Sequence, residues 1–286
     1  MKYTSIADFL SRQSGKLPAG PIAILLMEDR VETNSTLRHA LKLGFRTVLM
    51  LGDDRLDLSA ELHDQVHWIT YDMRGPDATT TAVNTIARVF AGRWVYYGYN
   101  AEYLFYPFCE TRNIAEMTAF SDEERRDSIL TYVIDLYAKD LAKHPNGVSL
   151  DEACIDQSGY YAQAHSRDDQ VMDRQLNIFG GLRWRFEEHV PEDRRKINRI
   201  GLFRARKDLE LRRDHTFNLE EYNTYACPWH NNITAAICSF RAAKSLKSNP
   251  GSSGKIPTFA WHNSRKYDWH SRQLLDLGLI EPGQWF

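Results

Sequence analysis

Acidic side chains are concentrated in two short segments, each directly after an apolar run. The runs are PIAILL at 21–26 and FRTVLML at 45–51, and both have the composition of a buried strand. The carboxylates that follow them are Glu28, Asp29 and Glu32 after the first run, and Asp53, Asp54 and Asp57 after the second. Parallel strands of one sheet end at the same edge, where open sheets bind ligands. These loops are therefore candidates for binding ribose hydroxyls or base edges.

A third run, RWVYYGY at 93–99, also predicts a strand, and Asn100, Ala101 and Glu102 follow it. Parallel packing would bring Glu102 to the same edge as the acidic loops. A carboxylate there could act as a general base, and the alternative is an ordinary loop acid. The acidic pair at 192–193 is a further candidate base, which we rank below Glu102.

Basic residues gather in the second half of the chain. Arg183 and Arg185 share one face if the segment FGGLRWRF at 179–186 is extended. The residues that could enlarge this pair into a cationic cluster are Lys196, Arg199 and Arg204. Guanidinium groups bind phosphates through paired hydrogen bonds, so the cluster could hold a diphosphate. The alternative is that these arginines form surface salt bridges with the many acids.

The sequence lacks the motifs of several common binding sites. The first loop, MEDRVETN, has no glycine, which removes the glycine-rich turn of nicotinamide and flavin proteins, and no phosphate-binding GxxxxGK[ST] motif occurs. The four cysteines, which are Cys109, Cys154, Cys227 and Cys238, form no C-x-x-C pair and are expected to be reduced thiols. His262 and His270 lie among aromatic residues without the spacing of a metal site, so we expect packing or surface histidines.

Composition favours a soluble, cytoplasmic protein. The 286 residues are 43% hydrophobic, and 36 basic and 38 acidic residues give a net charge of −2, which argues against nucleic acid as a partner. Residues 1–20 lack the apolar core of a signal peptide, and no run of about 18 apolar residues predicts a transmembrane helix.

Periodicity predicts alternating strands and helices. In the first half we expect strands at 21–26, 45–51, 66–71 and 93–99, a helix from Asn34 that Asn34 or Ser35 caps and Gly44 ends, and a helix at 78–91. Two such apolar runs joined through a helix form a right-handed parallel βαβ unit. In the second half we expect a long helix from a Ser121/Glu124 capping box through Leu141, a loop at 150–175 and a helix at 231–248.

The order of these pieces resembles the GT-A fold of family 2 glycosyltransferases, especially a bacterial branch that handles surface polysaccharides. The resemblance covers most of residues 20–245. It rests on ETNSTLRHALKLGFRTVLMLGDD at 32–54, on WVYYGYNAEYL at 94–104, and on FGGLRWRF at 179–186 followed by KINRIGLFRAR at 196–206 and by His215.

This resemblance implies a role for each matching residue. The nucleotide-sugar ligands would be Glu32, Asp54, Arg183, Arg185, Lys196, Arg204 and His215, and the catalytic residue would be Glu102. In the family's D-x-D-E-[FY]-[LV] motif, Tyr99 and Ala101 stand where the metal-binding aspartates would be. Asn100 and one carboxylate are a poor ligand set for manganese or magnesium, so we expect no metal site and no cofactor.

The resemblance also implies an architecture and a reaction. We expect a lead-in at 1–20, one α/β GT-A-like domain at 21–248 with a mostly parallel sheet flanked by helices, and a C-terminal helical extension at 249–286. The expected reaction transfers a sugar from a nucleotide diphosphosugar to a carbohydrate or lipid-linked acceptor in polysaccharide synthesis, with at most peripheral membrane contact. The alternatives are a catalytically silent sugar-nucleotide-binding relative and a partner-binding scaffold, because the fold alone cannot choose.

Overall fold

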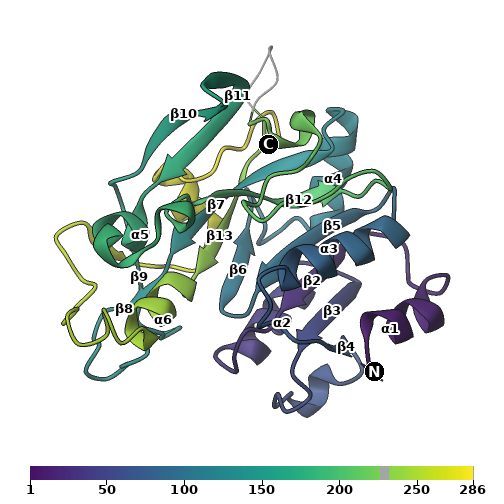
Figure 1. Cartoon of the computed structure of the whole chain (residues 1–286), viewed down its shortest axis with the longest axis horizontal. Helices are drawn as coiled ribbons and strands as arrows, with labels where there is room; N and C mark the ends of the chain where they lie inside the picture. Colours follow the sequence, from purple (N-terminus) through teal and green to yellow (C-terminus); the bar gives the residue numbers. More distant parts are fainter. Residues whose placement is uncertain (226–231, 286) are drawn as a thin grey trace. The chain divides into compact units, whose positions relative to one another are not determined.

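The computed structural model describes residues 1–225 and 232–285. They form an α/β structure with seven α-helices and a large mixed sheet of nine strands (Figure 1). The α/β class and the mostly parallel sheet are as the sequence predicts. Contacts divide the chain into two compact units: unit 1 comprises 1–103, 109–130 and 200–223, and unit 2 comprises 104–108, 131–199 and 224–286. The units are built from interleaved segments, so the predicted boundaries after residues 20 and 248 stay predictions.

Unit 1 contains the predicted βαβ arrangement. Its elements are β1 (Lys2–Tyr3), α1 (Ile6–Gln13), β2 (Ile22–Leu26), α2 (Thr33–Lys42), β3 (Thr47–Gly52), β4 (His67–Thr70), α3 (Ala78–Val89), β5 (Trp94–Tyr99), the first half of β6 (Glu102–Phe105), α4 (Ile114–Glu123) and most of β12 (Asn198–Arg204). Its strand order is β1-β4-β3-β2-β5-β12, with β12 antiparallel to β5 and the other pairs parallel. All residues of β2, β3 and β5 are buried, which explains their continuous apolar runs.

Unit 2 contains smaller sheets and short helices. Its elements are most of β7 (Ser128–Asp135), β8 (Tyr137–Ala138), β9 (Ala153–Asp156), β10 (Tyr161–Arg167), β11 (Gln170–Phe179), α5 (Gly181–Arg185), β13 (Ala235–Ser239), α6 (Arg241–Ser248), β14 (Ser264–Lys266) and α7 (Ser271–Asp276). Strands β7 and β13 are parallel, β10 and β11 form an antiparallel hairpin, and β14, β9 and β8 form a three-stranded sheet. Within the described residues, none of the helices has both the length and the hydropathy needed to cross a bilayer.

The predicted start of the second element needs a correction. Helix α2 begins at Thr33, and its N-cap is Glu32 rather than Asn34 or Ser35. The side chain of Asn34 instead accepts a hydrogen bond from the backbone N–H of Ser59. Gly44 follows the helix at φ +90°, as predicted for a left-handed residue at this position.

The predicted helix from Ser121 through Leu141 is wrong. Helix α4 ends at Glu123, and SILTYVID forms strand β7, which pairs with β13. Apolar residues at helical spacing are present, but the residues between them are mostly buried too, and the β-branched and aromatic content favours a buried parallel strand. Asp135 consequently lies at the carboxyl end of a strand. The predicted helix placed it within a helix instead.

Two further predictions in unit 2 are also wrong. The expected loop at 150–175 contains β9, β10 and most of β11. The expected helix at 231–248 contains strand β13 and is helical only over α6; its first residue lies outside the described part of the chain, as does Cys227. The condition that the segment around Arg183 is extended is not met: it forms helix α5, and Gly180 and Gly181 before Arg183 have positive φ.

Candidate functional site

The order in which the chain adds strands to the sheet of unit 1 reverses between β2 and β5. The chain adds β3 and β4 on one side of β2 and then crosses to place β5 on the other side. Leu26 at the end of β2 is in register with Leu51 and with Tyr99, so the loops after all three strands leave the same edge, as predicted. An open α/β sheet binds ligands at such a switch point, beyond the carboxyl ends of the strands.

Asn100 connects the two loops at the switch point. Its side chain is completely buried, and its Oδ1 accepts a hydrogen bond from the backbone N–H of Glu28 at 2.9 Å. Its Nδ2 donates to the carboxylate of Asp29 and to the carbonyl of Val31 at 2.8 Å. The amide therefore fixes the loop after β2 from the end of β5, a role that the sequence interpretation did not assign.

Two residues beside the switch point hold left-handed backbone conformations. Glu32 has φ +56° and Ala101 has φ +59°. Residues other than glycine adopt such backbone angles at a cost of about 1–3 kcal/mol each. The Glu32 carboxylate accepts a hydrogen bond from Ser35, whose hydroxyl also contacts Tyr103 at 2.8 Å. The backbone N–H of Ala101 donates to Thr36 at 2.8 Å. Such strain persists where the surroundings fix it and occurs often at binding sites.

Glu102 is only 2% exposed, and its Oε2 accepts the backbone N–H of Tyr99 at 3.0 Å. The phenol of Tyr99 contacts the Thr79 hydroxyl at 3.0 Å. In the described residues, no cluster of three or more His, Cys, Asp or Glu side chains could hold a metal ion.

The loops after β2, β3 and β4 each contain an arginine as well as carboxylates. The arginines are Arg30 after β2, Arg55 after β3 and Arg74 after β4. Arg55 folds back on Asp53 and Arg74 folds back on Asp72, each donating its backbone N–H and its guanidinium to the same carboxylate. The arginine hydrogen bonds lower the pKa of Asp53 and lower that of Asp72 to about 2. The edge therefore presents positive and negative groups together.

Asp54 and His215 lie toward this edge, whereas Arg204 does not. Asp54 is exposed in the loop after β3. His215 belongs to a segment that runs back along α3, and its Nδ1 contacts the phenol of Tyr97 at 3.0 Å. Arg204 pairs with Trp94, the first residue of β5, which is roughly 17 Å from the strand's carboxyl end. The expected approach of Arg204 to Asp54 is therefore wrong.

Arg204 has structural partners of its own. It forms ion pairs with Asp122 and Asp127 at 3.4 and 3.8 Å. It also lines a surface pocket of about 500 Å³ with Arg206 and Lys207.

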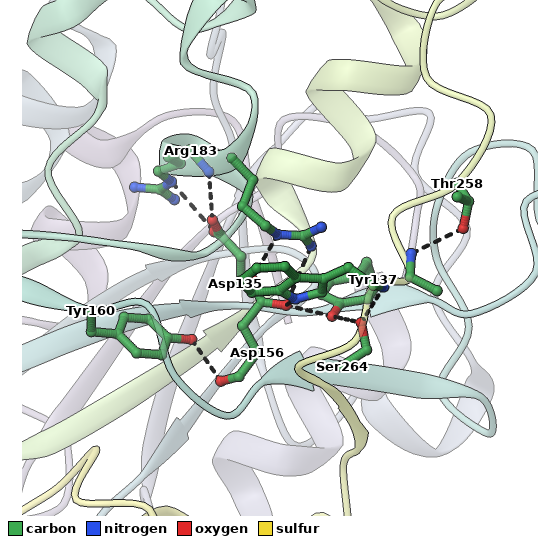
Figure 2. Close-up of polar contacts among 10 residues, drawn as sticks. Asp135, Tyr137, Asp156, Tyr160, Arg183, Thr258 and Ser264 are labelled. Carbon is green, nitrogen blue, oxygen red and sulfur yellow. Dashed lines mark hydrogen bonds and ion pairs between the residues drawn. The ribbon is translucent and has the colours of Figure 1, made fainter.

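In unit 2, Arg185 is committed to a buried ion pair. Its Nε donates to Asp156 Oδ2 at 2.8 Å, and the side chains are 10% and 1% exposed. Asp156 also accepts hydrogen bonds from the Tyr137 phenol and from Trp261 Nε1 at 2.7 Å (Figure 2). The guanidinium lies over the rings of Tyr137 and Trp261, with its carbon 5.3 and 4.8 Å from their centroids. Arg185 therefore forms a buried ion pair, and it is neither part of a surface salt bridge nor available to bind a phosphate.

Arg183 pairs with a second buried carboxylate. Its Nε lies 3.3 Å from Asp135 Oδ1 (Figure 2). Its Nη1 donates to the carbonyl of Lys196 at 3.1 Å. Asp135 ends β7 and has a completely buried side chain, and among residues 1–225 and 232–285 its Oδ1 has no hydrogen-bond partner. Burial raises the pKa of Asp135 to about 6, although the Arg183 guanidinium acts in the opposite direction. Lys196 contributes only its carbonyl to this pair.

We expect the stability of the protein to depend on the ionisation of Asp135. The folded state binds the proton more tightly than the unfolded state, in which the pKa is near 3.8. The resulting stabilisation is complete below about pH 4 and is lost as the pH rises through about 6. With the pKa raised from 3.8 to about 6, the free energy of unfolding should be lower at pH 8 than at pH 4 by an amount on the order of 3 kcal/mol.

Urea unfolding of the wild type and of Asp135→Asn between pH 4 and 8 measures this effect. The side chain of Asp135→Asn stays neutral, so the free energy of unfolding of this variant should increase relative to that of the wild type as the pH rises. A difference that does not change with pH would show that Asp135 keeps an ordinary pKa.

No model of a known protein family matches this chain, and a search of curated proteins finds no match either.

Proposed function

We propose that the chain binds a nucleotide diphosphosugar at the switch point between β2 and β5 and transfers its sugar to a carbohydrate or lipid-linked acceptor. The observation that carries the proposal is the convergence of three loops with hydrogen-bonding side chains at that edge. In this proposal Asp54 and Glu32 bind the ribose or base. Glu102 is the general base for the acceptor hydroxyl.

The departing diphosphate needs positive charge, since the proposal includes no metal. Arg55 and Arg74 suit this task, because their side chains are 77% and 90% exposed and their partner carboxylates are exposed as well. Exposed ion pairs are weak, so the guanidinium groups can exchange a carboxylate for a phosphate at little cost. This assignment replaces Arg183 and Arg185, which neutralise buried carboxylates.

Two other functions compete with active transfer: binding of a sugar nucleotide without turnover, and presentation of a partner-binding surface. Calorimetric titration with a panel of nucleotide diphosphosugars, with and without manganese, separates them when an assay for nucleoside diphosphate release accompanies it. Binding with acceptor-dependent release supports the transferase. Binding without release supports the silent relative, and absence of binding across the panel rejects a nucleotide function.

A further inference from the structure

Two large aromatic side chains remain exposed on unit 2. Tyr161 is 42% exposed and Trp184 is 40% exposed, and they are the only large aromatic residues among the strongly exposed hydrophobic residues of the described chain. Tyr161 begins β10 and Trp184 lies in α5, which follows the end of β11 (Figure 1). Apolar rings left in water in this way commonly mark a binding surface.

The rings are held in fixed positions. Tyr161 stacks on its cross-strand partner Phe179, with ring centroids 5.2 Å apart, and meets Trp184 edge to face at 6.5 Å. Gly159, at φ +92°, lets the backbone pass beside the Trp184 ring, where a Cβ atom would lie 3.3 Å from Cζ3. Rings that are already positioned lose little conformational freedom when a ligand binds.

We propose that Tyr161, Phe179 and Trp184 form an aromatic platform that binds a pyranose ring of a saccharide. A pyranose has a face of C–H bonds that packs on an aromatic ring, and a rim of hydroxyl groups that needs polar surroundings. The hairpin meets both needs, because its other exposed residues are mostly polar. The platform would hold the acceptor, so this inference rests on the proposed function and names the acceptor class as carbohydrate.

The size of the platform argues against a protein partner. A fully buried aromatic side chain hides about 150–250 Å², so the exposed parts of two rings offer roughly 200 Å². A stable protein interface needs about 800 Å² from each partner. One or two sugar rings are a better match for the available area.

Saturation-transfer NMR with methyl hexopyranosides and short oligosaccharides as probes tests the platform. The wild type should transfer saturation to C–H protons on one face of the sugar. Trp184→Ala and Tyr161→Ala should each weaken binding at least tenfold, and Trp184→Phe should retain part of it. Val171→Ala is the matched control, because Val171 lies in the same hairpin, is 69% exposed and is aliphatic, and its binding should equal that of the wild type.

Absence of saccharide binding in the wild type, or equal binding in Trp184→Ala, would overturn the inference. Sedimentation at several concentrations supplies a further check: self-association that Trp184→Ala abolishes would make the platform an interface between copies. Nucleotide titration of the same variants tests the proposed transferase function separately from the aromatic platform. Nucleotide binding without saccharide binding rejects only the platform, whereas saccharide binding without nucleotide binding rejects only the transferase.

Discussion

Replacing Asp156 by alanine should lower the free energy of unfolding by about 3–5 kcal/mol, the usual cost of removing one partner from a buried ion pair. The substitution leaves Arg185, whose side chain is 10% exposed in the wild type, without its carboxylate. It also removes the acceptor for the Tyr137 phenol and for Trp261 Nε1. Urea unfolding monitored by circular dichroism measures the change.

The matched control is Asp173→Ala, because Asp173 also pairs with an arginine but has a side chain that is 84% exposed. That variant should change the unfolding free energy little, as expected for a surface pair. Equal effects of the two substitutions would show that the Asp156 cluster is solvated. Arg185→Ala should be destabilising for the same reason as Asp156→Ala, so a loss of nucleotide affinity in that variant would not identify a ligand contact.

Asn100→Ala should lower the free energy of unfolding by roughly 3 kcal/mol. The substitution removes three hydrogen bonds of a buried side chain and leaves the backbone N–H of Glu28 and the carbonyl of Val31 without this partner. Losing a partner costs a buried polar group about 1–3 kcal/mol, and these contacts, which are partly buried, lie at the lower end of that range. Thermal unfolding and urea titration at neutral pH measure the loss.

Asn100→Asp sharpens the test, because it places a second carboxylate beside Asp29. Repulsion raises the pKa of the new carboxyl group, so this variant should be less stable at pH 8 than at pH 5 when each is compared with the wild type. Adding Asp29→Asn should restore part of the stability by providing an amide donor. No pH dependence and no rescue would contradict the contact.

The first half of the fold could be predicted because its local signals agree with its packing. PIAILL forms a strand that neighbours bury on both faces, and Gly44 ends the following helix where predicted. The segment SILTYVID could not be assigned from periodicity, because a buried parallel strand and a buried helix both give a nearly continuous apolar run. Only pairing with β13, about 100 residues later, decides between them.

The candidate site was predictable in position but not in its internal contacts. Parallel strands must end at one edge, so the acidic loops could be brought together from the sequence alone. Nothing in the spacing of Arg183 and Arg185 indicates that they neutralise Asp135 and Asp156, because those partners are 48 and 29 residues distant. An aspartate that ends an apolar run, as Asp135 does, is the signal that could have identified the first pair.

The affinity of a nucleoside diphosphate for Asp54→Ala, compared with Asp64→Ala, tests the proposed site most directly. Both aspartates are exposed, but Asp54 follows β3 at the switch edge and Asp64 precedes β4 at the opposite edge. Loss of a charged hydrogen bond of about 1.5–3 kcal/mol should weaken binding to Asp54→Ala roughly 10- to 100-fold, with an unchanged melting temperature. Asp64→Ala should bind as the wild type does. Equal affinity in the two variants, or no nucleotide binding by the wild type, would contradict a nucleotide site at the switch point.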